Sequence, residues 1–239
     1  MTGKRILLTG FEPFSDLGYN ESSEVVNIIS DSGVDDIEIV HRVLSVDKKG
    51  TIESLGLLKT EDFDAVLHLG LSRNSEEIRL ERYASNEISM PFPDNSGRMI
   101  KGREIIENSP ERIETTVSIH NFDEEFEHDS DVQWSQSAGS FVCNETYFRT
   151  LSKFANTSIP ILFIHLPKKS KVALSRQSEI VSRVIRLMIS RPKMIVVGAM
   201  IRNSEGSILS CMRPKGDAWS GWWEFPGGKV EEDESLKDA

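Results

Sequence analysis

Cysteine and histidine side chains near the expected ends of two elements could together perform nucleophilic catalysis. Cys143 follows the stretch 137–141 (SAGSF), which is rich in small residues and leads into an expected helix. Backbone N–H groups at a helix N-terminus lack partners and carry partial positive charge, so a thiol placed there loses its proton more readily. The simpler interpretation is a small buried hydrophobic residue, as most free cysteines are. Taken alone, this stretch favours the simpler interpretation.

A cysteine nucleophile needs a base within hydrogen-bond reach and an acid that orients the base. His165 follows the wholly apolar run 161–164, so we expect it at the carboxyl edge of a sheet, while Glu81 lies on a half-buried strand. His68 is an alternative base or an inward-facing core histidine, with its side chain on the face opposite Leu67 and Leu69. The weaker candidates lie in polar surroundings, and they are His41, His120 and His128.

Two aromatic residues flank a proline in the loop expected after the first strand. Phe11 and Phe14 would lie at the carboxyl end of that strand, where open α/β sheets bind their ligands. They are equally well explained as core residues, so the sequence leaves both interpretations open.

Alternating apolar runs predict the elements that position these side chains. Residues 6–8, 37–40, 65–69, 78–80 and 161–164 have the composition of strands, and 48–58, 139–154 and 180–188 have helical spacing. A further helix is expected to begin at Ser22 or Ser23. This alternation predicts βαβ units and a mostly parallel sheet, hence an α/β fold. The acidic segment 123–131, which contains His128, is predicted to be a solvated loop rather than a metal site.

Composition restricts the class of partner and the compartment. The chain of 239 residues has 38 acidic against 28 basic side chains, which argues against nucleic acid or an anionic membrane as the main partner. The two cysteines are too few for a disulfide scaffold and fit a reducing compartment. The sequence shows neither a signal-peptide core nor an apolar run of membrane-spanning length. We therefore expect a soluble, cytoplasmic protein.

Five motifs in order resemble pyroglutamyl peptidase I, a family of cytosolic cysteine peptidases. The motifs are 6–14 (ILLTGFEPF), 78–86 (IRLERYASN), 93–97 (PDNSG), 137–144 (SAGSFVCN) with Tyr147, and 163–167 (FIHLP). The resemblance covers roughly residues 4–188.

The resemblance implies a fold, a reaction and a set of site residues. It implies a three-layer α/β/α sandwich, often tetrameric, that removes an N-terminal pyroglutamyl residue from peptides without metal or cofactor. Cys143 would be the nucleophile, His165 the general base and Glu81 its orienting acid. The family packs the lactam ring between aromatic side chains, which correspond here to Phe11, Phe14 and Phe141.

The chain departs from the family pattern at the loop that shapes the substrate pocket. After Gly70, where the family has Gln-Ala-Gly-Gly-Arg, residues 71–75 read LSRNS, so Leu71 replaces the glutamine. Losing two glycines changes where the backbone can go. The family's Asn-Pro before the first helix is Asn20-Glu21 here. We therefore expect these differences to affect the preference for pyroglutamate more than the hydrolysis itself.

Residues 194–239 resemble the first part of a Nudix hydrolase, which predicts two domains, 1–190 and the partial segment 194–239. Gly228 and Glu234 match the opening of the Nudix box, but the Arg-Glu and Glu-Glu pairs that hold Mg²⁺ would follow Ala239. Glu234 is thus a remnant of an incomplete box, and we expect no nucleotide hydrolysis by residues 1–239. Two alternatives remain: a peptidase-like body in a longer nucleoside-triphosphate pyrophosphohydrolase, and a non-catalytic interaction module.

Overall fold

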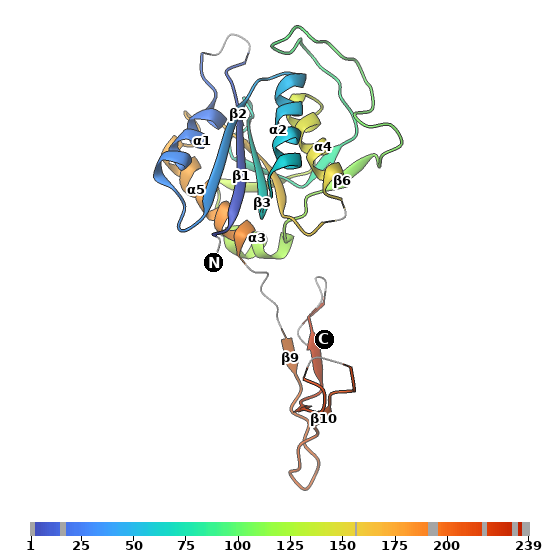
Figure 1. Ribbon diagram of the computed structural model, residues 1–239. Coiled ribbons are helices and arrows are strands. Elements are labelled where there is room, and N and C mark those ends of the chain that lie inside the picture. Colours follow the sequence, from blue (N-terminus) through green and yellow to red (C-terminus); the bar gives the residue numbers. More distant parts are fainter. Residues whose placement is uncertain are drawn as a thin grey trace. The chain divides into compact units, whose positions relative to one another are not determined.

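The chain forms two compact units, residues 1–190 and 191–239, which are described separately (Figure 1). A computed structural model describes residues 3–14, 18–155, 157–190, 196–216, 219–230 and 234–235.

A six-stranded sheet with the order β2-β1-β3-β8-β4-β7 forms the centre of the first unit. All neighbouring strands run parallel except β4 and β8, which pair antiparallel. This mostly parallel sheet confirms the predicted α/β fold. The strands are β1 (Arg5–Phe11), β2 (Glu38–Leu44), β3 (Ala65–Leu71), β4 (Ile78–Glu81), β7 (Val132–Ser135) and β8 (Ile161–Leu166).

Helices cover both faces of the sheet. Successive side chains of a strand point to opposite faces, and because the buried strands are apolar throughout, both faces must be covered. In β3, Leu67 and Leu69 pack in one core cluster with α1 (Glu21–Ser32) and α5 (Leu174–Ile189). Val66 belongs to a second cluster, on the side of α2 (Lys48–Thr60) and α4 (Val142–Lys153). Figure 1 shows α1 and α5 on one side of the sheet and α2 and α4 on the other.

Two helices begin at other residues than predicted. The N-cap of α1 is Asn20, whose side chain accepts a hydrogen bond from the Ser22 backbone N–H. Ser22 instead accepts a 3.0 Å hydrogen bond from the backbone N–H of Phe11, which ties the helix to β1. Helix α4 begins at Val142 and not at residue 139, because Gly139 has a φ of +79°, outside the helical range.

The prediction of a solvated loop over residues 123–131 was wrong. Helix α3 spans Ile119–Phe126, with Ser118 as its cap and with Phe122 and Phe126 buried one turn apart. Asp129 follows the helix and forms ion pairs with Arg176 at 2.6 Å and Arg183 at 2.7 Å. The segment is therefore fixed against α5 rather than free in solvent.

Both units also contain separate two-stranded sheets of short strands. In the first unit, β5 (Tyr83–Ser85) and β6 (Arg112–Glu114) form an antiparallel pair. In the second, β9 (Val196–Gly198) pairs with β12 (Gly227–Lys229), and β10 (Cys211–Met212) pairs with β11 (Trp223–Glu224). The apolar residues of 194–201, 207–212 and 222–225 predict longer strands than these. Residues 194 and 195 lie outside the described residues.

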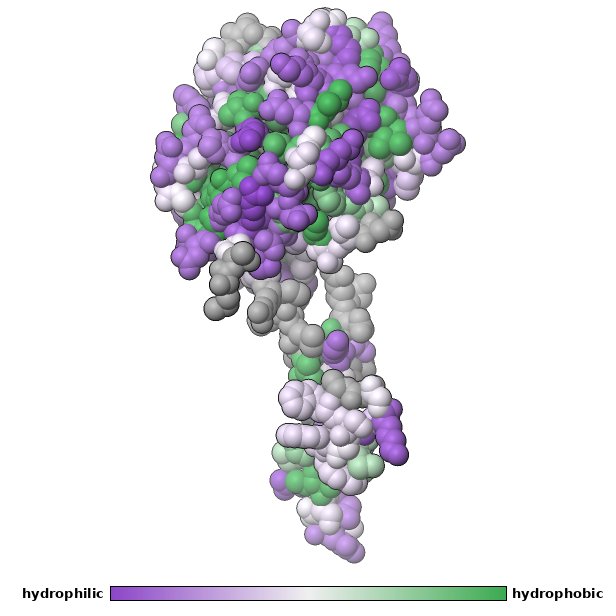
Figure 2. All heavy atoms as spheres, in the orientation of Figure 1, coloured by the Kyte–Doolittle hydropathy of each residue, from purple (hydrophilic) through white to green (hydrophobic). Residues whose placement is uncertain are grey.

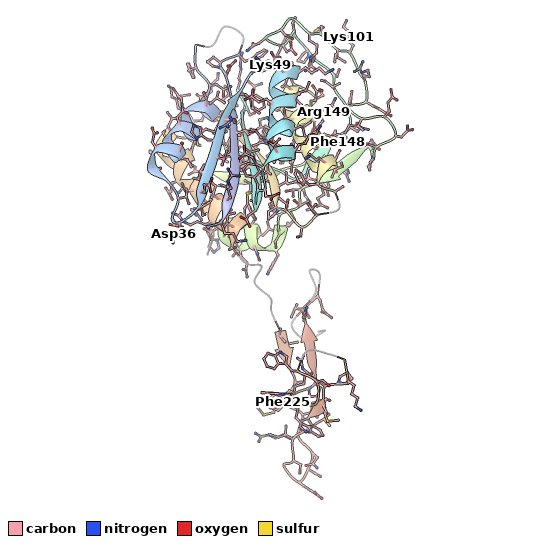
Figure 3. All side chains as sticks on the ribbon, viewed as in Figure 1. Asp36, Lys49, Lys101, Phe148, Arg149 and Phe225 are labelled. Carbon is pink, nitrogen blue, oxygen red and sulfur yellow. The ribbon has the colours of Figure 1, made fainter. Side chains whose placement is uncertain are left out.

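The second unit has large apolar side chains on its surface, and the first has a mixed surface. Trp222, Trp223 and Phe225 are exposed within a unit of only short strands, and Figure 3 labels Phe225 there. On the face of the first unit shown in Figure 2, hydrophilic side chains are interspersed with apolar ones. In the described part of the chain, no helix combines the length and apolar composition needed to cross a membrane.

Candidate active site

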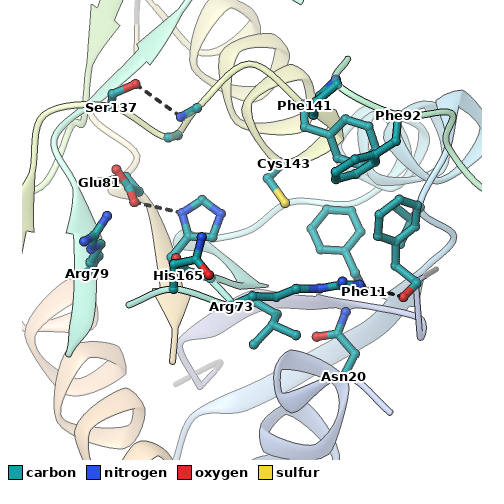
Figure 4. A pocket seen from close by; sticks show the side chains of 18 of the residues that line it. Phe11, Asn20, Arg73, Arg79, Glu81, Phe92, Ser137, Phe141, Cys143 and His165 are labelled. Carbon is teal, nitrogen blue, oxygen red and sulfur yellow. Dashed lines mark hydrogen bonds and ion pairs between the residues drawn. The ribbon is translucent and has the colours of Figure 1, made fainter. Parts of the chain in front are cut away.

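The ends of several elements of the first unit enclose a pocket of about 450 Å³. Cys143, His165 and Glu81 line it, together with the other residues that the sequence singled out for substrate binding. Those are Phe11, Phe14, Phe141 and Leu71, and Figure 4 shows the pocket from close by.

Cys143 is the second residue of α4, so its thiol lies in the first turn, where backbone N–H groups have no intrahelical partner. Gly70 of β3 allows this position. A methyl group added at Gly70 would lie 3.2 Å from the Cys143 Sγ atom and 2.8 Å from the Phe163 ring. A larger residue at position 70 would therefore have to displace the Phe163 ring and would crowd the sulfur.

His165 and Glu81 lie on the neighbouring strands β8 and β4. The Nδ1 atom of His165 is 2.8 Å from the Glu81 Oε1 atom, and Glu81 is only 1% exposed. His165 lies within β8 rather than beyond its end, because the strand continues to Leu166 by pairing with Gly70 and Leu71 of β3.

The surroundings of His165 favour its protonated form. Burial would lower the pKa of the imidazole, but its hydrogen bonds to Cys143 and Glu81 outweigh burial and raise the pKa to about 9. The ring therefore holds a proton at neutral pH, between a sulfur on one side and a buried carboxylate on the other.

His68 is a core residue and does not line the pocket. Its ring is fully buried and lies 2.7 Å from the Thr9 hydroxyl and 3.0 Å from the Thr150 hydroxyl. Burial lowers its pKa to about 3, so the ring stays neutral. Of the two bases that the sequence left open, the structure places only His165 beside Cys143. The remaining histidines are also outside the pocket lining: His41, His120 and His128.

Aromatic rings form one end of the pocket. The ring centroids of Phe14 and Phe141 are 5.2 Å apart, and Phe92 is 5.4 Å from Phe14 and 5.3 Å from Phe141. Phe11 lies at the end of β1 rather than in the following loop, and it is 2% exposed, so it belongs to both the core and the pocket wall. Nothing in the sequence singles out Phe92, because the prolines on both sides of it are typical of a loop.

The unusual loop after Gly70 forms part of the pocket wall. Leu71, Ser72, Arg73 and Asn74 line the pocket. The Arg73 guanidinium donates a 3.0 Å hydrogen bond to the backbone carbonyl of Phe14 and lies over the Phe14 ring, 5.9 Å from its centroid. The loop thus places a cation where the family pattern has a glycine.

Buried hydrogen bonds fix the first turns of α4 relative to the strands. The Asn144 amide donates to the backbone carbonyls of Ser85 at 2.8 Å and Glu87 at 2.9 Å. The Tyr147 hydroxyl donates a 3.0 Å hydrogen bond to the Glu81 carbonyl. These contacts connect the helix that carries Cys143 to the strand that carries Glu81. The motif around Cys143 contained both residues, but their roles depend on contacts about 60 residues away in the chain.

No cluster of metal-binding side chains accompanies the site. Among the described residues, no group of three or more His, Cys, Asp or Glu side chains could hold a metal ion. Glu234 is described, whereas its acidic neighbours 231–233 lie outside the described residues.

Comparisons with known proteins identify the family to which the sequence is similar. The sequence model of the pyroglutamyl peptidase family matches residues 4–200, and that of the NUDIX domain matches residues 192–239. The pyrrolidone-carboxylate peptidase of Oceanobacillus iheyensis is 33% identical over 176 residues, covering 72% of this chain and 88% of that protein.

Solved structures of the same class superpose on the chain. The pyrrolidone carboxyl peptidase of Fervidobacterium islandicum has 32% identity and a TM-score of 0.70, covering 77% of this chain and 97% of its own. The Thermus thermophilus enzyme has 33% identity and a TM-score of 0.66, covering 77% of this chain and 98% of its own.

Proposed function

This chain belongs to the pyroglutamyl peptidase family, and on that premise we propose that it cleaves peptides after an N-terminal pyroglutamyl residue through Cys143, His165 and Glu81. One observation carries the proposal. The Cys143 thiol contacts a His165 ring that is hydrogen-bonded at 2.8 Å to buried Glu81, at the end of an aromatic-lined pocket. A nucleophile, a base and an orienting acid are the parts that acyl transfer requires.

The aromatic end of the pocket suits the pyroglutamyl ring. The lactam is small, flat and uncharged, and the rings of Phe14, Phe92 and Phe141 present apolar surfaces of matching size. A ring held there would direct its acyl carbon toward Cys143.

The reaction then follows in two steps. With the thiol proton on His165, the Cys143 sulfur attacks the carbonyl carbon that joins the pyroglutamyl ring to the next residue. Backbone N–H groups in the first turn of α4, including that of Cys143, stabilise the oxyanion. His165 gives its proton to the leaving amine as the C–N bond breaks, which leaves a thioester on Cys143.

Water completes the cycle. Neutral His165 takes a proton from water, the resulting hydroxide attacks the thioester, and free pyroglutamate leaves as the Cys143 sulfur departs and recovers its proton. Glu81 keeps the imidazole ring oriented through both steps. The proposed reaction needs no metal or cofactor. By resemblance to the family's cytosolic tetramers, we also propose a cytoplasmic location and a homo-oligomer.

A fluorogenic substrate tests the reaction. We expect the chain to release the fluorophore from pyroglutamyl-7-amino-4-methylcoumarin, and expect Cys143→Ala to abolish release and His165→Ala to reduce it at least about 1,000-fold. Cys211→Ala is the matched control, because Cys211 is exposed and lies in the second unit.

Two outcomes would contradict the proposal. Full activity in Cys143→Ala would show that another group is the nucleophile. A chain that leaves the pyroglutamyl substrate intact while cleaving a prolyl or alanyl analogue would show that the altered pocket has lost its preference.

The NUDIX match of residues 192–239 favours a second candidate function for a longer protein, a Mg²⁺-dependent nucleoside-triphosphate pyrophosphohydrolase. The gene sequence after codon 239 discriminates between the two. An open reading frame that continues with the Arg-Glu and Glu-Glu pairs of the box would identify a bifunctional parent.

A further inference from the structure

Arg79 of β4 is one of the charged residues that line the pocket. Its Nε atom is buried and has no hydrogen-bond partner among the described residues. Among these described residues, no carboxylate forms an ion pair with the Arg79 guanidinium. A buried cationic donor left unsatisfied is costly, unless a ligand supplies the missing acceptor.

The register of the sheet places Arg79 beside the catalytic histidine. Because β4 and β8 are antiparallel, Arg79 lies directly opposite His165, and opposite residues project from the same face of a sheet. Figure 4 shows Phe11, Phe92 and Phe141 to one side of Cys143 and His165, and Arg79 with Glu81 to the other side.

This arrangement assigns the two ends of the pocket to the two parts of the substrate that the scissile bond joins. The pyroglutamyl ring occupies the aromatic end, and the leaving amine must lie near His165 to receive its proton. The residue that follows pyroglutamate is thereby directed toward Arg79. A guanidinium is planar and always charged, and it binds a carboxylate through two parallel hydrogen bonds.

We propose that Arg79 binds a carboxylate on the residue that follows pyroglutamate, which makes acidic leaving residues the preferred substrate class. The carboxylate is either the free C-terminus of a pyroglutamyl dipeptide or the side chain of aspartate or glutamate at that position. This inference rests on the proposed function, because it uses the orientation of the scissile bond across Cys143 and His165.

A different role for Arg79 would be to orient Glu81, two residues away on the same face of β4. The Glu81 Oε2 atom also has no hydrogen-bond partner among the described residues. Such a positioning role would affect every substrate equally, whereas carboxylate binding affects only acidic ones.

Four peptide substrates, tested on the chain of 239 residues, separate these roles. Pyroglutamyl-alanine and its C-terminal amide differ only in the α-carboxylate. The C-terminal amides of pyroglutamyl-glutamate and pyroglutamyl-glutamine differ only in a side-chain carboxylate. We expect the wild-type chain to cleave at least one acidic member about tenfold more efficiently than its neutral match, and the favoured pair identifies the source of the carboxylate.

Arg79 variants assign that preference to the guanidinium. Arg79→Leu should lower kcat/KM for the favoured acidic substrate about 10- to 100-fold, mainly through KM, with less than about a twofold effect on its neutral match. Arg79→Lys should recover part of the loss, because it restores the charge but not the paired geometry. Arg103→Leu removes an exposed arginine outside the pocket lining and should leave the preference unchanged.

The outcomes that overturn the inference are distinct from failure of the proposed function. Equal wild-type kcat/KM for acidic and neutral substrates would overturn it even if Arg79→Leu does not fold. Equal loss on both substrates in Arg79→Leu would assign Arg79 to positioning Glu81. Absence of wild-type cleavage of all four peptides and of the fluorogenic substrate would instead contradict the proposed function.

Discussion

The charge of His165 is set by a balance between burial and the hydrogen bonds to its two neighbours, Cys143 and Glu81. Burial lowers the pKa of the ring, and the hydrogen bonds to Cys143 and Glu81 raise it further than burial lowers it, to about 9. A protonated imidazole suits the step in which the leaving amine takes up a proton. The 2.8 Å contact with Glu81 also fixes which ring nitrogen faces the sulfur.

The basic limb of the pH profile should therefore report on His165. We expect kcat/KM to fall as pH rises through about 9, because the ring loses the proton that the leaving amine needs. Glu81→Gln removes a contribution that raises the pKa, so its basic limb should move to lower pH. Initial rates from neutral to alkaline pH on an uncharged substrate provide the measurement.

The control for this shift is Glu114→Gln, which removes a carboxylate that pairs with Arg82 at 2.6 Å outside the pocket lining. Its limb should match that of the wild type. An unshifted limb in Glu81→Gln would show that Glu81 does not stabilise the protonated ring.

At the scale of elements, apolar periodicity in the sequence predicted where the buried strands lie. It could not predict how strands far apart in the chain pair with each other. Buried runs gave the positions of β1, β3 and β8 because a strand covered on both faces is apolar throughout. Helix α3 was missed because only two of its residues, Phe122 and Phe126, are buried, and the residues between and around them are mostly acidic or polar. The antiparallel direction of β4 has no local signal, and it alone places Arg79 opposite His165.

The site could be predicted only in part, for the same reason. Cys143 and His165 were singled out by their places at element ends, and their proposed roles and that of Glu81 still derive from the family resemblance. Phe92 was not predicted as a site residue, because the prolines on both sides of it indicated only a loop. His68 could not be separated from His165 by sequence, because each belongs to an apolar run, and only the three-dimensional contacts show which one faces the pocket.

His68 connects β1, β3 and α4 through hydrogen bonds to Thr9 and Thr150, and this connection should be visible in acid. The folded-state pKa is lowered to about 3 from an ordinary value of 6.5. As pH falls between these values, the unfolded chain binds a proton that the folded chain excludes, so the free energy of unfolding falls. The slope attributable to His68 approaches about 1.4 kcal/mol per pH unit.

Chemical denaturation across this pH range measures that slope. His68→Gln retains hydrogen-bonding groups but cannot titrate, so its stability should fall less steeply than that of the wild type. His120→Gln, at an exposed position on α3, should leave the slope nearly unchanged. Parallel profiles for the wild type and His68→Gln would contradict the buried neutral histidine.

At the scale of the molecule, the pocket is built within one unit. All of its lining residues lie between Phe11 and His165, whereas the NUDIX match begins at residue 192. The chain's two cysteines are divided between the units, Cys143 in the first and exposed Cys211 in the second. Cys211 is the more exposed of the two thiols, so exposure alone would favour acylation of Cys211. Acylation of Cys143 instead would therefore be due to the residues around it.

The most direct test of the central claim is to locate the acyl group during turnover. The full chain is mixed with a pyroglutamyl 4-nitrophenyl ester, quenched in acid and digested for mass spectrometry. We predict one pyroglutamyl group on Cys143, none on Cys211, and no acylated peptide from Cys143→Ala. An acyl group on Cys211 or on a serine, or continued turnover by Cys143→Ala, would contradict the assignment of Cys143 as the nucleophile.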